Sequence, residues 1–103
     1  MEVFKHLSVT EAKQVMETQP VTIVDIRDSN AFSQGHIPHA KSVNDENLEI
    51  FLQETDKNKP LICCCYHGIS SQNAAAFFAG QGFKDVYSID GGYEEWRKQY
   101  GQN

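Results

Sequence analysis

Two short apolar runs constrain the fold of this chain more than any other feature. The runs are "VTIVDI" at 21–26 and "LICCC" at 61–65, and such nearly continuous runs are typical of strands buried on both faces of a parallel sheet. A third run, "DVYSI", stands at 85–89. Segments with helical apolar spacing separate the three runs. Strands that alternate with helices predict an α/β fold, a doubly wound and mostly parallel sheet of about five strands with helices on both faces.

The remaining segments complete this scheme. Short strands are expected in "VFKHL" (3–7) and "KSV" (41–43). Ser8 stands three residues before Glu11, which is the spacing of a capping box, so a helix is expected to begin there. Further helices are expected at 29–34 with Asp28 or Ser29 as the cap, from Asn44 or Asp45, at 70–82, and at 93–100. Because no repeat or Pro/Gly/Ser-rich linker appears, we expect residues 1–103 to form one domain.

Charge and hydropathy exclude several classes of partner. The net charge is −5, and the 9 basic residues are spread along the chain, whereas nucleic-acid binding needs clustered Lys and Arg. No apolar stretch approaches the roughly 20 residues that span a bilayer. The start, "MEVFKHLS", lacks the basic end and apolar middle of a signal peptide. We therefore expect a cytoplasmic protein that binds neither nucleic acid nor membrane.

The chain has three cysteines, and all three are adjacent, at Cys63, Cys64 and Cys65. Neighbouring cysteines do not readily bridge each other and no distant partner exists, so we expect reduced thiols. Consecutive strand residues point in opposite directions, and no second cysteine pair is present, so we expect no metal site. Cys63 and Cys64 lie inside the strand and are expected to be small core residues.

Cys65 differs because it stands where the strand ends and a loop, "YHGIS", leads into a helix. The first N–H groups of a helix have no intrahelical partners, and Gly68 lets the loop close into a ring of inward-pointing N–H groups. Such surroundings lower the pKa of a thiol and favour the reactive thiolate. Ser70 and Ser71 can cap the helix or point hydroxyls inward. The residues alone leave open an ordinary strand-to-helix turn behind a core cysteine.

A phosphatase loop is a poor match. Cysteine phosphatases have the pattern Cys-x5-Arg, and here Ser71 stands at the position of the Arg that binds the phosphate dianion. The residues by themselves therefore indicate a reactive thiolate in an anion-binding nest and do not identify its substrate.

Three blocks together resemble the rhodanese family of sulfurtransferases. "VDIRDSNAFSQGHIPHA" (24–40) is similar to the family's D-x-R-x4-[FY]-x2-G-H-I-x2-A signature, "CYHGISS" (65–71) to its active-site loop, and "SIDGGYEEWRKQ" (88–99) to its Gly-Gly turn and Trp-bearing helix. The loop, which has no Arg or Lys, is especially similar to that of single-domain GlpE-type thiosulfate sulfurtransferases. Ile69 departs from the more polar residue expected at that position.

The resemblance implies a ping-pong sulfur transfer without a cofactor. Cys65 would be the catalytic nucleophile and would carry a persulfide made from thiosulfate, with release of sulfite. Its loop would bind the substrate through Tyr66, His67, Gly68, Ile69, Ser70 and Ser71. The acceptors would be small thiophiles such as cyanide, or a dithiol protein such as thioredoxin. Alternatives are a persulfide carrier with little thiosulfate activity and an inactive structural domain, which commonly lacks the cysteine.

Other members of the signatures have structural interpretations. Asp25 and Arg27 are expected to connect neighbouring loops near the strand end, and Tyr93 with Trp96 to pack the last helix on the core. Asp90 begins the Gly-Gly turn, which is expected to lie beside the active site. Whether Arg27, Lys41 or His67 assists substrate binding is left open by the sequence.

Overall fold

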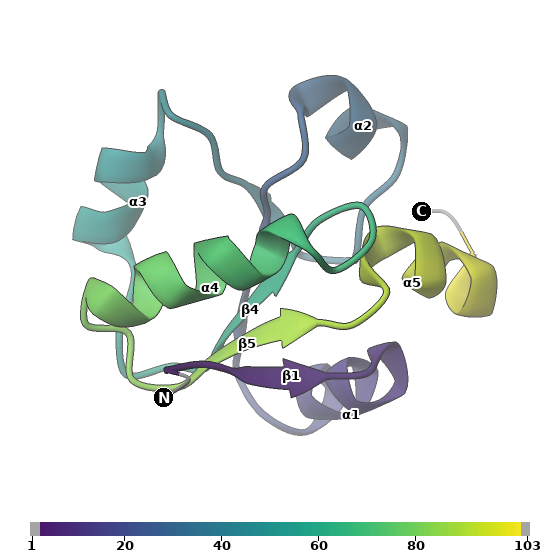
Figure 1. Cartoon of the computed structure of the whole chain (residues 1–103), viewed down its shortest axis with the longest axis horizontal. Helices are drawn as coiled ribbons and strands as arrows, with labels where there is room; N and C mark the ends of the chain where they lie inside the picture. The colour runs from purple at the N-terminus through teal and green to yellow at the C-terminus, as the bar shows by residue number, and fades with distance from the viewer. Residues whose placement is uncertain (1–2, 102–103) are drawn as a thin grey trace.

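The computed structural model of the chain describes residues 3–101, in which five strands alternate with five helices (Figure 1). The strands are β1 (Lys5–Leu7), β2 (Thr22–Asp25), β3 (Lys41–Ser42), β4 (Leu61–Cys64) and β5 (Val86–Ile89). The helices are α1 (Val9–Thr18), α2 (Ser29–Gln34), α3 (Leu48–Glu54), α4 (Ser70–Gly80) and α5 (Gly92–Tyr100).

The strands form one parallel sheet in the order β1-β5-β4-β2-β3. The predicted α/β architecture is confirmed, and each of the four strand pairs is parallel. β4, the strand that leads to Cys65, is the central strand and pairs with β2 on one side and with β5 on the other. All carboxyl ends therefore lie along one edge of the sheet, where ligands bind in folds of this type.

Two apolar cores lie on the two faces of the sheet. One core joins Cys64 and Ile62 to α1 and to Trp96 of α5. The other joins Cys63 to Phe51 of α3 and to α4, which crosses the front of the sheet in Figure 1. Alternate residues of β4 thus enter opposite cores, as the period of two of a strand requires. The same alternation holds Cys63 and Cys64 apart, each in its own core.

The predicted starts of α1 and α2 are confirmed, and in each a side chain accepts a hydrogen bond from a free backbone N–H group. The Ser8 hydroxyl accepts a hydrogen bond from the Glu11 N–H at 3.1 Å, and the Glu11 carboxylate accepts one from the Ser8 N–H at 2.9 Å. This is the predicted capping box. Asp28 caps α2 by accepting a hydrogen bond from the Ala31 N–H at 2.8 Å.

The start of α3 differs from the prediction. The helix begins at Leu48 instead of at Asn44 or Asp45, because Asn44 and Asn47 close a turn before it. The Asn44 side chain accepts from the N–H groups of Glu46 and Asn47, and the Asn47 side chain accepts from the Asn44 N–H. Asparagine competes with helical hydrogen bonding in this way. Among the described residues, no helix is both long and apolar enough to cross a membrane.

Candidate active site

Cys65 is the first residue after β4, at the carboxyl edge of the central strand. It lies one position beyond the strand that the sequence predicted to include it. The residue is only 2% exposed, so its side chain is almost completely buried. Burial raises the pKa of Cys63 and of Cys64 far above the ordinary thiol value. Those two thiols are therefore unreactive core residues, as expected.

The Cys65 sulfur lies inside a ring of hydrogen-bond donors. The Gly68 N–H donates to Sγ at 3.1 Å, and the Ser71 N–H donates at 3.2 Å. The Ser71 hydroxyl lies 3.2 Å from Sγ, where it accepts a hydrogen bond from the neutral thiol and can donate one to the thiolate. Burial works against ionisation, but the Ser71 and Ser70 hydroxyls and the two N–H groups outweigh it, so the pKa of Cys65 is lowered. These contacts therefore favour the thiolate form of Cys65.

Gly68 gives the loop its shape. Its φ is +88°, a left-handed conformation that side chains rarely adopt. A Cβ on Gly68 would stand 2.7 Å from the Gly91 nitrogen and 2.9 Å from the Ile89 oxygen. The loop therefore packs backbone against backbone on the turn between β5 and α5, and the Gly68 position has no room for a side chain.

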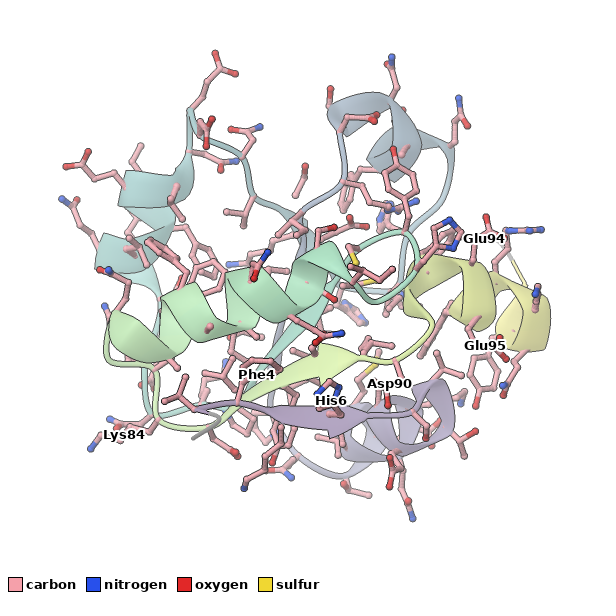
Figure 2. All side chains as sticks on the ribbon, in the orientation of Figure 1. Phe4, His6, Lys84, Asp90, Glu94 and Glu95 are labelled. Atoms are coloured by element: carbon pink, nitrogen blue, oxygen red, sulfur yellow. The ribbon has the colours of Figure 1, made fainter. Side chains whose placement is uncertain are left out.

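Helix α5 holds the other side of the loop. Its Tyr93 N–H donates to the Cys65 carbonyl at 2.8 Å, and its Glu94 N–H donates to the Tyr66 carbonyl at 3.1 Å. Gly92 makes this approach possible, because a Cβ there would lie 2.5 Å from the Cys65 carbonyl oxygen. Figure 2 shows Glu94 at the start of α5. The first turn of α5 thus receives the loop carbonyls, which leaves loop N–H groups directed at the sulfur.

The Gly-Gly turn lies beside the site, as expected. Asp90 precedes it and accepts a hydrogen bond from the His6 ring across the sheet edge, with Nδ1 and Oδ1 at 2.8 Å (Figure 2). Tyr93 and Trp96 are 4% and 3% exposed, which confirms that they pack the last helix on the core. The "DGGY" part of the motif therefore positions the cysteine loop without contacting the sulfur.

Asp25 and Arg27 form a buried ion pair below the loop. Arg27 Nη2 lies 2.7 Å from Asp25 Oδ2 and also donates to the Gly35 carbonyl at 2.8 Å. The guanidinium stands over the Tyr93 ring, 4.3 Å from its centre. These contacts connect the end of β2 to α2 and α5, so the predicted structural role is confirmed. Its hydrogen bonds go to Asp25 and Gly35, and its guanidinium also lies against the Tyr66 ring of the cysteine loop, so Arg27 is not a free cation.

Tyr66 ties the loop to α2. Its hydroxyl donates to Asp28 Oδ2 at 2.6 Å, and its ring lies 5.6 Å from the Arg27 guanidinium carbon. This hydrogen bond lowers the pKa of Asp28 and raises the pKa of Tyr66. Asp28 therefore has two roles, since it also caps α2.

The other predicted loop residues lie at different depths. Ile69 is 75% exposed and His67 is exposed, so both face away from the sulfur. Of the two alternatives left open for Ser70 and Ser71, capping of α4 is not observed, because Ile69 occupies the cap position and no side chain caps the helix. Ser71 is instead fully buried beneath the sulfur. Its hydroxyl lies 3.2 Å from Sγ and 2.7 Å from the Ser88 hydroxyl.

Lys41 and His67, which the sequence named as possible aids to substrate binding, lie in different parts of the structure. Lys41 lies on the edge strand β3, beyond β2 from β4. His67 contributes to lowering the pKa of Glu94, for which the Arg97 hydrogen bond is the largest cause. Within residues 3–101, no group of three or more His, Cys, Asp or Glu residues could hold a metal ion.

One buried contact near the sulfur was not found from the sequence. The hydroxyl of Ser88 on β5 lies 2.7 Å from the hydroxyl of Ser71, and both serines are 0% exposed. A polar residue inside the apolar run "DVYSI" was the available signal, but nothing local connects it to a residue seventeen positions earlier.

Comparison with known proteins agrees with this geometry. Residues 8–99 match the family model described as a Rhodanese-like domain. A Shewanella oneidensis protein named thiosulfate sulfurtransferase GlpE is 53% identical over 98 residues, covering 95% of this chain and 97% of the relative. A Pseudomonas syringae protein of the same name is 46% identical over 99 residues, covering 96% of this chain and 92% of the relative. The crystal structure of a rhodanese-like domain protein from Staphylococcus aureus superposes with a TM-score of 0.78 at 28% identity, covering 90% of this chain and 91% of that one. The chain belongs to the rhodanese-like domain family.

Proposed function

We propose that this chain is a thiosulfate sulfurtransferase, that residues 1–103 act as one rhodanese domain, and that Cys65 is the nucleophile. The observation that carries the proposal is the set of three donors on one sulfur, the N–H groups of Gly68 and Ser71 and the Ser71 hydroxyl. Relatives that span nearly the whole chain bear the name thiosulfate sulfurtransferase. A sulfur held in this way ionises readily and can carry a second, anionic sulfur.

The reaction has two displacements at sulfur. The Cys65 thiolate attacks the outer sulfur of thiosulfate, the sulfur–sulfur bond of thiosulfate breaks, and sulfite leaves with the electron pair. The product is an anionic persulfide on Cys65, which is a covalent intermediate. Cyanide then takes the outer sulfur as thiocyanate and restores the thiolate. No proton is gained or lost in either step, so no general base is needed.

The loop residues 66–71 form the proposed binding site for the transferred sulfur. A persulfide is acidic, so its outer sulfur carries a negative charge at neutral pH. Backbone N–H dipoles fixed by Gly68 and by the start of α4 would stabilise this charge without reorganisation. Tyr66 and Ile69 would form the rim that the donor and the acceptor must pass.

We propose that a dithiol protein, such as a thioredoxin, also accepts the sulfur, in the cytoplasm. The supporting observation is the exposed apolar rim, where Ile69 is 75% exposed and Tyr66 is exposed beside it. One thiol of the acceptor would attack the outer sulfur, and the second would close a disulfide with release of hydrogen sulfide. Reduced cysteines in the chain suit a reducing compartment.

The rim can be tested with acceptors of different size. Ile69→Gln should raise the KM for a thioredoxin acceptor several-fold and change the kinetics with cyanide far less, because cyanide is small enough to pass the rim without packing against it. Equal effects on both acceptors would contradict a role of the rim in protein binding.

The main test is formation and discharge of the persulfide. Incubation with thiosulfate should add the mass of one sulfur atom to the peptide that contains Cys65, and cyanide should remove it as thiocyanate. Cys65→Ser should abolish both steps, whereas the matched variant Cys64→Ala should retain them. Turnover by Cys65→Ser would disprove the site. Labelling without turnover would instead favour a persulfide carrier.

A further inference from the structure

We propose that Ser88 is a positioning residue, which directs the Ser71 hydroxyl onto the Cys65 sulfur. The three side chains form a buried chain of contacts, with 2.7 Å between the two serine oxygens and 3.2 Å between the Ser71 oxygen and Sγ. Ser88 comes from β5, whereas Ser71 begins α4. The contact therefore links the sheet to the loop that carries the thiol.

The number of protons in this series of hydrogen bonds shows which charge state of Cys65 the series favours. Two contacts join the three atoms, so two protons satisfy them. With a thiolate, the Ser88 hydroxyl donates to Ser71 and the Ser71 hydroxyl donates to the sulfur, and each proton has an acceptor. With a neutral thiol, three protons share two contacts and one is left over. A buried donor without an acceptor is costly, so the chain stabilises the thiolate.

Ser88 determines the direction in which these hydrogen bonds are donated. Within residues 3–101, Ser71 is the side-chain partner of the Ser88 hydroxyl. Either oxygen could donate in this contact. With the thiolate as the final acceptor, the Ser88 hydroxyl donates to the Ser71 oxygen, which leaves the Ser71 proton for the sulfur. Hydrogen bonds in a chain also polarise and strengthen one another. Without Ser88, the Ser71 hydroxyl could rotate away from the sulfur.

The position of Ser88 indicates that the hydroxyl has a specific use. It faces the same side of β5 as Val86, which belongs to the apolar core below α4. It is 0% exposed, and its hydroxyl contacts the Ser71 hydroxyl at 2.7 Å. A small apolar residue would fill this place at lower desolvation cost, so the hydroxyl is best explained by its contact with Ser71.

The test is the pH dependence of Cys65 alkylation by iodoacetamide, located by mass spectrometry of the Cys65 peptide. Ser88→Ala should raise the alkylation pKa by roughly half a unit to one unit, as expected for loss of one buried hydrogen bond. In a Ser71→Ala background, Ser88→Ala should cause no further shift, because Ser88 acts through Ser71. Ser88→Cys preserves size and offers a weak donor, so it should give a smaller shift and carries the test if Ser88→Ala does not fold.

A matched control separates this role from general packing. Thr22→Val removes a buried hydroxyl at the start of β2, at the edge of the sheet away from Cys65. It should leave the alkylation pKa of Cys65 unchanged. The proposal is overturned if Ser88→Ala does not move that pKa, or moves it equally with and without Ser71. Apart from the thiol that Ser88→Cys adds, the ionisable groups on the packed elements stay the same in every variant, namely Cys63, Cys64, Asp25, Arg27, Asp28, His67 and Asp90.

This inference rests on the proposed role of Cys65 as the reactive thiol, but its test uses no sulfur donor. A shift in the alkylation pKa without persulfide formation from thiosulfate would contradict the proposed function alone. Persulfide formation with an unchanged alkylation pKa in Ser88→Ala would contradict the positioning role alone.

Discussion

The sharpest prediction concerns Gly68, which both packs tightly against the β5–α5 turn and donates a hydrogen bond to the Cys65 sulfur. In Gly68→Ala, the new Cβ would stand 2.7 Å from the Gly91 nitrogen and 2.9 Å from the Ile89 oxygen. Both are backbone atoms, so neither can move aside as a flexible side chain would. The φ of +88° costs an alanine about 1–2 kcal/mol, and displacement of packed backbone adds roughly 1–3 kcal/mol. We expect Gly68→Ala to lower the free energy of unfolding by about 2–5 kcal/mol.

The same substitution should damage the reaction in the fraction that stays folded. The Gly68 N–H is one of the donors to Sγ, at 3.1 Å, and the loop must retreat from the β5–α5 turn to admit a methyl group. A hydrogen bond to a charged group contributes about 1.5–3 kcal/mol. We therefore expect persulfide formation to slow by roughly 10- to 100-fold, measured by sulfite release per folded molecule.

Gly82→Ala is the matched control. Gly82 also has a positive φ, +101°, but its Cβ would meet only the Lys57 Cδ at 3.5 Å, an ordinary contact. In urea unfolding, this variant should lose only the free energy that comes from the unfavourable backbone conformation, about 1–2 kcal/mol. It should keep full activity. If Gly68→Ala were no less stable than Gly82→Ala, or equally active, the close packing of the loop on the turn would not matter and the reasoning would be refuted.

The remaining predictions concern charge. Folding lowers the pKa of Cys65, so its ionisation stabilises the fold fully above the unfolded thiol pKa of about 8.5, and this contribution is lost as pH falls through the lower folded value. The difference in unfolding free energy between wild type and Cys65→Ser should therefore grow with pH, and a flat difference would contradict it. Asp25→Asn leaves the Arg27 cation buried without its carboxylate, so urea unfolding should show a loss of about 3–5 kcal/mol; a loss below about 1 kcal/mol would show that the pair is not structural. Since the net charge is −5, kcat/KM for the thiosulfate dianion should rise with ionic strength as repulsion is screened, and a fall would point to a cationic binding site.

The sequence predicted those features that depend on local pattern. The apolar runs around Ile23 and Ile62 identified the buried parallel strands, because strands covered on both faces consist mostly of apolar residues. The Ser8 capping box identified the start of α1, because all of its groups lie within one helical turn. The position of Cys65 followed from the end of β4 and the start of α4, which are also neighbours in sequence.

Features that depend on tertiary contact could not be predicted in the same way. The Ser88–Ser71 contact joins a strand to a helix start, and the α5 N–H groups meet carbonyls of Cys65 and Tyr66 from a distant loop. For a related reason, the sequence could not decide whether Ser70 and Ser71 cap the helix or point their hydroxyls inward. A serine at a helix start usually caps the helix, but here the Ser71 hydroxyl contacts both the sulfur and Ser88.

The use of position 71 explains how the loop can select a single sulfur atom. The Ser71 side chain is fully buried and in contact with Sγ, so it supports the nucleophile and presents no cation to an oxyanion above the loop. Thiosulfate would leave its sulfonate oxygens near the rim, where Ile69 is exposed. The donors would instead act on the sulfur that stays after sulfite departs. Interactions that stabilise the transferred atom more than the bound substrate speed the chemical step without strengthening substrate binding. A loop without its own cation is thus suited to passing on one sulfur, and poorly suited to retaining phosphate.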